Sequence, residues 1–181
     1  MVVRTGYIKS FISEELPIAF NNVYSEKTKP VKILKENSNQ NIRFNVMPNR
    51  YVEEDVKIKE YRVWDNAIET IFDRDYKTDM LNSPSHLTFL SSLTNLQKMV
   101  YVFMHHYLSL DYNKDANELI KVWPGKLNID MPKMVMKKTN IRHLMIIKSI
   151  YQIKNNRYKV QADTVVDNAV TISGEALIVV L

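Results

Sequence analysis

The stretch SPSHLTFLSSLTNLQKMVYVFMHHYL, residues 83–108, decides which fold this sequence can adopt. After a Ser-Pro-Ser break, apolar residues recur every three or four positions, which is typical of one face of an α-helix. These residues are Leu90, Leu93, Leu96, Val100, Phe103, Met104 and Tyr107. The apolar surface is widened further by Met99, Val102 and Leu108. Because a helix that is apolar on most sides is usually buried, we expect this helix at the centre of the fold.

The sequence after this helix is typical of antiparallel strands. Residues 141–154, 158–167 and 170–181 are rich in β-branched residues or alternate apolar with polar ones, and short polar turns separate them. Such a pattern predicts a meander of three long strands. Residues 131–138 are predicted as a further strand, and residues 109–125 as a loop or short helix that ends at a Pro-Gly pair.

The sequence before the helix also predicts strands. Residues 31–36 and 42–47 alternate apolar and polar side chains around a polar turn, which indicates a hairpin. Residues 56–64 are a third strand candidate, and residues 65–76 fit either a short helix or a strand. A further helix is predicted to begin at Ser13, where two glutamates follow in a favourable first turn.

One buried helix flanked by strands needs a curved sheet around it. We therefore predict an α+β fold of the hotdog type, in which an antiparallel β-sheet wraps around a central buried helix. Residues 1–181 are expected to form a single domain of this type, with residues 1–30 as a candidate helical extension at the N-terminus.

The composition excludes several kinds of chemistry. The chain has three glycines, and no glycine-rich phosphate loop is present. It has no cysteine, which excludes disulfides, thiolate catalysis and Cys-ligated zinc. Residues 1–20 lack the uninterrupted apolar run of a signal peptide, and no stretch is apolar enough to span a membrane. From these features we expect a cytoplasmic protein.

Three stretches resemble the FcoT-like long-chain fatty acyl-CoA thioesterases, a hotdog-fold family of acyl-thioester metabolism. HLTFLSSLTNLQKMVY (residues 86–101) is similar to the family's segment around its histidine and buried helix, with Gln97 where an asparagine is expected. RYKVQADTVVD (157–167) and SGEALIVVL (173–181) resemble its last two strands. The resemblance covers roughly residues 76–181. More distant resemblances are to the AvrD-like hotdog group and to the dehydratase branch.

The helix entrance is the predicted reaction centre. The free N–H groups and partial positive charge at a helix N-terminus polarise a thioester carbonyl, and the apolar helix lines a channel for the acyl chain. His86 is the candidate general base, since a histidine side chain can take a proton from a water near neutral pH. Asn95 and Gln97 are the catalytic candidates that hold the water or carbonyl. The competing interpretations are a capping histidine and buried structural amides.

Other residues are predicted to bind the substrate. Tyr76 and Asn82 are candidates for the mouth of the channel, and Tyr101, one turn beyond Gln97 on the helix, is a further substrate-binding candidate. The span 121–159 holds ten Lys or Arg residues against one acidic residue, Asp130, and suits an anionic partner. Phosphates of coenzyme A or of an acyl carrier protein are the expected contacts of Lys137, Lys138 and Arg142. A solvated basic surface is the alternative, and nucleic acid is not expected.

These observations favour hydrolysis of fatty acyl thioesters, without cofactor or metal. One alternative is a 3-hydroxyacyl thioester dehydratase, which requires a carboxylate near His86 such as Asp73, Asp75 or Asp79. Another is a non-catalytic module that binds an acyl ligand or a partner. Since long edge strands pair readily and the hotdog resemblance implies a dimer, we expect a homodimer or a higher homo-oligomer.

Overall fold

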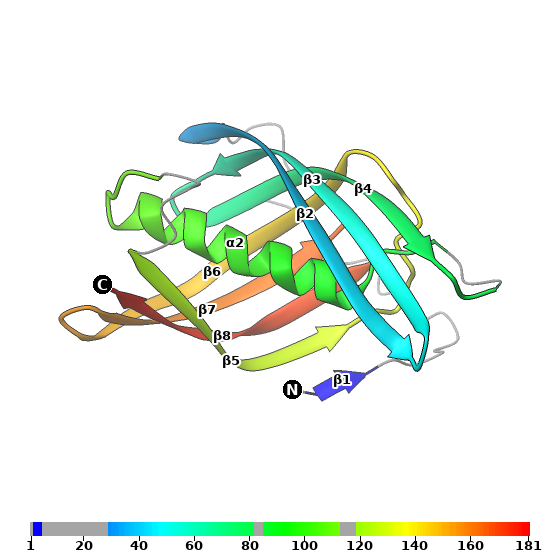
Figure 1. Ribbon diagram of the computed structural model, residues 1–181. Helices are drawn as coiled ribbons and strands as arrows, with labels where there is room; N and C mark the ends of the chain where they lie inside the picture. Colours follow the sequence, from blue (N-terminus) through cyan, green and yellow to red (C-terminus); the bar gives the residue numbers. More distant parts are fainter. Residues whose placement is uncertain (1, 5–28, 82–84, 113–118) are drawn as a thin grey trace.

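The computed structural model describes residues 2–4, 29–81, 85–112 and 119–181 (Figure 1). The described elements are β1 (Val2–Arg4), β2 (Lys32–Met47), β3 (Arg50–Val63), β4 (Ala67–Thr78), α2 (Phe89–Tyr107), β5 (Ile120–Asp130), β6 (Ile141–Lys154), β7 (Arg157–Val166) and β8 (Val170–Val180). All the strands belong to one sheet, in the order β1-β5-β8-β7-β6-β4-β3-β2. Every pair of neighbours is antiparallel except β1 and β5. None of the described helices is long and apolar enough to cross a membrane.

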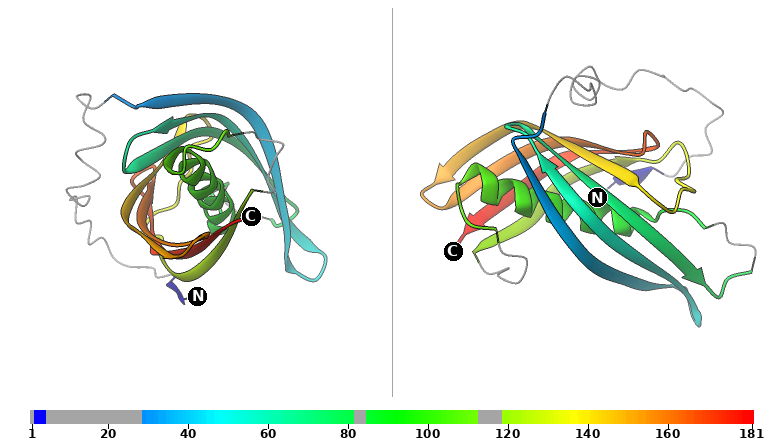
Figure 2. Two further views of the ribbon diagram at one scale, coloured as in Figure 1. Left: turned by 90° about the vertical axis from the view of Figure 1, so that its left-hand side faces the viewer. Right: turned by 90° about the horizontal axis from the view of Figure 1, so that it is seen from above.

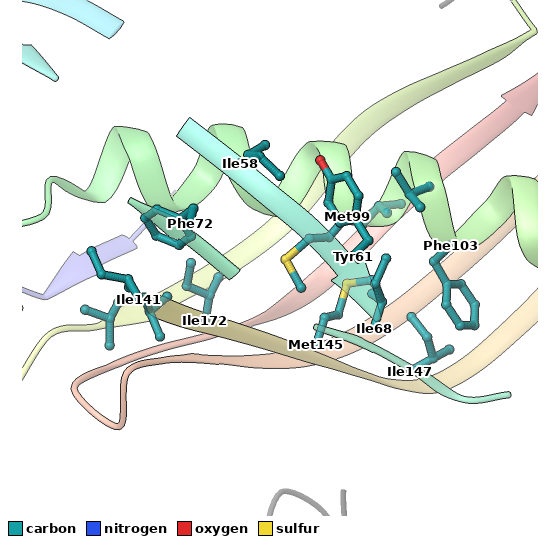
Figure 3. Packing of buried hydrophobic residues seen from close by; sticks show 14 of the residues in the cluster. Ile58, Tyr61, Ile68, Phe72, Met99, Phe103, Ile141, Met145, Ile147 and Ile172 are labelled. Atoms are coloured by element: carbon teal, nitrogen blue, oxygen red, sulfur yellow. The ribbon is translucent and has the colours of Figure 1, made fainter. Parts of the chain in front are cut away.

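The sheet curls around α2, so that the helix lies on its concave side (Figure 2). Side chains from the strands and from α2 form one apolar core there. In Figure 3, Tyr61 comes from β3 and Phe72 from β4, Met99 and Phe103 come from the helix, and Met145 comes from β6. This arrangement confirms the prediction of an antiparallel sheet wrapped around a central buried helix.

Local chemistry fixes both ends of the helix. Thr88 is the N-cap: its backbone is extended, and its side chain accepts a hydrogen bond from the Ser91 N–H. At the other end, Ser109 adopts a left-handed backbone with φ of 55°, and the N–H of Leu110 donates to the His105 carbonyl at 2.8 Å. The helix therefore spans almost the same residues as its apolar pattern.

The strands after residue 140 agree with the predicted meander, because β6 pairs with β7 and β7 with β8 through short turns. Two predictions for the preceding segments were wrong. Residues 131–138 form no strand, and residues 120–125, predicted as part of a loop or short helix, belong to β5. The Pro-Gly pair does not end an element there; a register shift between Pro124 and Leu127 accommodates it within the strand.

The predicted hairpin of residues 31–36 and 42–47 was also wrong, since residues 32–36 and 42–47 belong to the single strand β2. The polar residues between them form a bulge: Asn37 has a positive φ of 49°, and the register with β3 shifts between Lys35 and Ser38. The chain reverses instead at residues 48–49. Residues 65–76, whose sequence fits either a short helix or a strand, lie mostly in β4. The helix predicted at Ser13 lies outside the described residues.

Candidate active site between the helix and the sheet

An apolar cavity of about 170 Å³ lies between α2 and the four strands β5–β8. Small and aliphatic side chains form most of its wall, and polar side chains come from Thr94, Gln97, Thr164 and Glu175. The remaining lining residues are Leu90, Leu93, Leu96, Val100, Val122, Pro124, Leu127, Met145, Val160, Ala162, Ile172, Gly174 and Ala176. The cavity follows the helix for nearly three turns, from Leu90 to Val100. It suits a short alkyl chain.

Gly174 lets two strands of the cavity wall approach each other closely. A Cβ at this position would lie 2.4 Å from the backbone oxygen of Lys126 and 2.6 Å from Cδ2 of Leu127. No ordinary side chain fits at such distances. The bulge in β5 therefore depends on a glycine in β8.

Three buried polar residues link the helix to the cavity wall. The amide Nδ2 of Asn95, on α2, lies 3.1 Å from His143 Nδ1, on β6. The other ring nitrogen, Nε2, lies 3.1 Å from the Thr164 hydroxyl on β7, and Thr164 lines the cavity. Burial lowers the pKa of His143 from 6.5 to about 3, so the ring is neutral at physiological pH.

A second buried network surrounds the helix entrance. The Glu54 carboxylate accepts hydrogen bonds from the Thr88 N–H at 3.2 Å, from the Thr88 hydroxyl at 2.8 Å and from the Ser91 hydroxyl. Its other oxygen is 3.2 Å from Nη1 of Arg74. A protein carboxylate thus already neutralises the helix dipole at the place where the sequence predicted a substrate carbonyl.

Arg74 connects this network to the segment that follows β5. Its guanidinium donates to the carbonyls of Ser85, Val135 and Lys137 at 2.9, 3.1 and 2.9 Å. These bonds explain why residues 131–138 are held in place without belonging to a strand. Arg74 and Glu54 were both missed from the sequence. Arg74 lies in a stretch that fits either a helix or a strand, and Glu54 lies outside every predicted element.

The predicted catalytic residues do not all lie at one place in the structure. Gln97 is exposed and lines the rim of the cavity, whereas Asn95 points to His143 from the same helix. His86 lies just before the N-cap, with its ring centroid 6.0 Å from that of Tyr76. His86 and Tyr76 are therefore neighbours, as expected for two residues at one entrance, but neither is among the described residues that line the cavity.

The other predicted binding residues lie at several places. The ring of Tyr101 packs against His105, with centroids 4.2 Å apart, and burial raises the pKa of its hydroxyl. Asn82 lies outside the described residues. Lys137 pairs with Asp167 at 3.1 Å, and Arg142 pairs with Glu69 at 2.6 Å.

The backbone of Lys138 accepts a hydrogen bond from the Arg74 N–H at 2.8 Å. Phosphate binding by Lys137, Lys138 and Arg142 stays a prediction.

The carboxylates proposed for a dehydratase have other partners. Asp73 pairs with Lys59 at 2.8 Å, and Asp79 accepts a hydrogen bond from the Tyr51 N–H at 2.8 Å. Asp75 accepts a hydrogen bond from the N–H of Tyr76 at 3.0 Å. The carboxylate that reaches the helix entrance comes from β3 instead, as Glu54.

Comparison with known proteins gives a structural likeness only. No family model matches the sequence, and no curated protein matches it. One similar solved structure is a crystal structure of a mutant thioesterase from Pseudomonas aeruginosa, with 11% sequence identity and a TM-score of 0.43. The match covers 68% of this chain and 82% of that chain.

Proposed function

We propose that this protein is a hotdog-type enzyme that hydrolyses acyl thioesters of coenzyme A or of an acyl carrier protein, with the acyl chain in the cavity beside α2. The observation that carries the proposal is this cavity, which is lined almost entirely by apolar side chains. Each buried methylene of a chain contributes about 0.8 kcal/mol to binding, so an apolar cavity selects a hydrocarbon. The FcoT-like pattern of residues 86–101 supports the same proposal.

The size of the cavity favours short chains. Its volume is about 170 Å³, and apolar cavities of about 150 Å³ in other proteins bind benzene. The cavity therefore suits a chain of about six carbons. A longer chain has to extend past the exposed rim at Gln97 or displace a side chain of the wall.

His86 and Gln97 are the proposed catalytic groups. His86 acts as the general base for the attacking water, and Gln97 holds the water or the substrate at the rim of the cavity. The Glu54 carboxylate is already bonded to the first turn of the helix. We therefore place the acyl group along the helix flank, which begins at Leu90, rather than on the N-terminal axis.

A thiol-release assay tests this proposal directly. The chain has no cysteine, so a thiol-reactive dye reports only the thiol that leaves the substrate. Acyl-CoAs and acyl carrier proteins with chains of about four to sixteen carbons are compared, and we expect the highest kcat/KM near six carbons. Absence of thiol release from all of them, with the protein shown to be folded, would refute hydrolysis.

Acyl binding without catalysis is a second candidate. In the part of the chain that the structure describes, Glu175 is the only titratable residue lining the cavity. Its carboxylate is held by Lys159 at 2.8 Å, which helps to lower its pKa. Calorimetry with a non-hydrolysable acyl analogue, together with the thiol-release assay, separates the two candidates: a pure binding protein binds the analogue but releases no thiol from any acyl thioester, whereas an enzyme does both.

A further inference from the structure

The three-residue chain Asn95–His143–Thr164 runs from the middle of the helix to the cavity wall. All three side chains are at least 98% buried, with exposed fractions of 0%, 0% and 2%. Such a chain needs a proton arrangement in which each short contact joins one donor to one acceptor. The arrangement determines which group Thr164 offers to the cavity.

The amide fixes the tautomer of the histidine. Asn95 turns its Nδ2 toward His143 Nδ1 at 3.1 Å, while its Oδ1 is buried and has no hydrogen-bond partner among the described residues. In this orientation the amide donates, so Nδ1 is the acceptor and carries no hydrogen. A neutral ring then carries its hydrogen on Nε2, and burial keeps the ring neutral by lowering the pKa of His143 to about 3. Nε2–H therefore donates to the Thr164 hydroxyl oxygen at 3.1 Å.

The hydroxyl hydrogen of Thr164 is left for another acceptor. Among the described residues, His143 is the only hydrogen-bond partner of this hydroxyl. The wall around Thr164 is formed by Met145 and Ile172, which are its cross-strand neighbours and offer no oxygen from their side chains. A buried donor that lacks an acceptor is unfavourable, which indicates that a ligand supplies one.

We propose that the Thr164 hydroxyl donates its hydrogen to the carbonyl oxygen of the acyl group bound in the cavity, and that Asn95 and His143 position it for this role. This inference rests on the proposed function and specifies which wall residue recognises the substrate. The neutral carbonyl is preferred to a carboxylate, because the described lining residues include no lysine or arginine to pair with a buried negative charge. The free fatty acid is then a weak ligand, which favours its release after hydrolysis.

Two matched ligands test the hydrogen bond. The first is a ketone thioether of pantetheine, with a methylene between sulfur and carbonyl; the second is the alkyl thioether of equal length without the carbonyl. Pantetheine is the arm shared by coenzyme A and carrier proteins. We expect the wild-type protein to bind the ketone about tenfold more tightly, and Thr164→Val to bind both ligands with the affinity that the wild-type protein has for the thioether.

The variants distinguish this bond from packing. Thr164→Ser keeps the hydroxyl and should retain the preference for the ketone. Equal weakening of both ligands by Thr164→Val, or no weakening of either, would overturn the inference. If the wild-type protein binds neither ligand, the proposed function fails, and the ligand assigned to Thr164 fails with it.

The proton arrangement has its own readout, which does not depend on a ligand. Nitrogen-15 NMR of the histidine ring should show His143 neutral at pH 6 with its hydrogen on Nε2. In Asn95→Asp, the carboxylate accepts from Nδ1–H, so Nε2 becomes the acceptor of the Thr164 hydrogen. That variant should lose the preference for the ketone while keeping its affinity for the thioether. A wild-type ring with its hydrogen on Nδ1 would overturn the inference even if Asn95→Asp fails to fold.

Discussion

Arg74 and Glu54 form an ion pair in the interior, with Nη1 and Oε1 3.2 Å apart and neither side chain exposed. The pair joins β4 to β3, and through Thr88 and Ser91 it reaches the first turn of α2. Removing one partner of a buried pair leaves the other charge without compensation. We expect Arg74→Met to lower the free energy of unfolding by about 3–5 kcal/mol in chemical denaturation.

An exposed ion pair on the same strands provides the control. Lys77 lies 3.1 Å from Asp55, and both side chains are more than 40% exposed. Lys77→Met should therefore change the free energy of unfolding by less than about 1 kcal/mol. Similar losses in Arg74→Met and Lys77→Met would contradict a special role for the buried pair.

Gly174 gives a second prediction about stability. A methyl group at this position meets the Lys126 carbonyl at 2.4 Å, so Gly174→Ala must push β5 away from β8. We expect a loss of about 1–3 kcal/mol or more, measured by denaturation. Gly125→Ala is the matched control, because its nearest contact, the backbone oxygen of Glu175, is 3.2 Å away. An equal loss in both variants would argue against the close approach at Gly174.

The size of the cavity is tested by filling it. Ala176 lies in the cavity wall, and Ala176→Leu adds three carbons to that wall. We expect this variant to shift the preferred acyl chain to shorter lengths by about three carbons, measured as kcat/KM or as ligand affinity across a chain-length series. Thr171→Leu places the same side chain at an exposed position of β8 and should leave the profile unchanged. An unshifted profile in Ala176→Leu would place the acyl chain elsewhere.

Two histidine variants, at His86 and at His106, distinguish a role in catalysis from the general effect of losing a histidine. If His86 is the general base, His86→Ala should lower kcat for thiol release about 100-fold or more while affinity for a non-hydrolysable analogue stays the same. His106, at the far end of α2, is the control, and His106→Ala should retain wild-type kcat. Unchanged turnover in His86→Ala would remove this residue from the mechanism.

The sequence predicted the centre of this fold better than its edges. The sequence of helix α2 has a clear 3.6-residue period, and the sequences of β6–β8 show strand patterns between short turns. The residue ranges predicted from both patterns agree closely with the structure. In β2 the polar run around Asn37 predicts a turn but forms a bulge, because a bulge and a turn use the same residue types. The Pro-Gly pair in β5 predicts the end of a loop or short helix, but it lies within a strand at a register shift, for the same reason.

The site was less predictable, because its connections are long-range. Asn95 was selected from the helix, but its partner His143 is 48 residues away and Thr164 lies on a third element. Nothing in the local sequence distinguishes Thr164 from other strand threonines. Glu54 was similarly hidden among neighbouring acidic residues of a strand. Only the pairing of β6 with β7, and the packing of α2 on them, brings these groups together.

The buried histidine predicts how stability depends on pH. Burial lowers the pKa of His143 from 6.5 to about 3, so below pH 6.5 the unfolded chain binds a proton that the folded protein does not. The contribution of His143 to the free energy of unfolding is therefore fully present above pH 6.5. It falls as pH decreases toward 3, by up to about 1.4 kcal/mol per pH unit. Denaturation at several pH values between 6.5 and 5 measures this slope, before most carboxylates titrate. His143→Gln lacks the group and should show a flatter dependence than the wild-type protein, and identical slopes would show that His143 is not held neutral in the core.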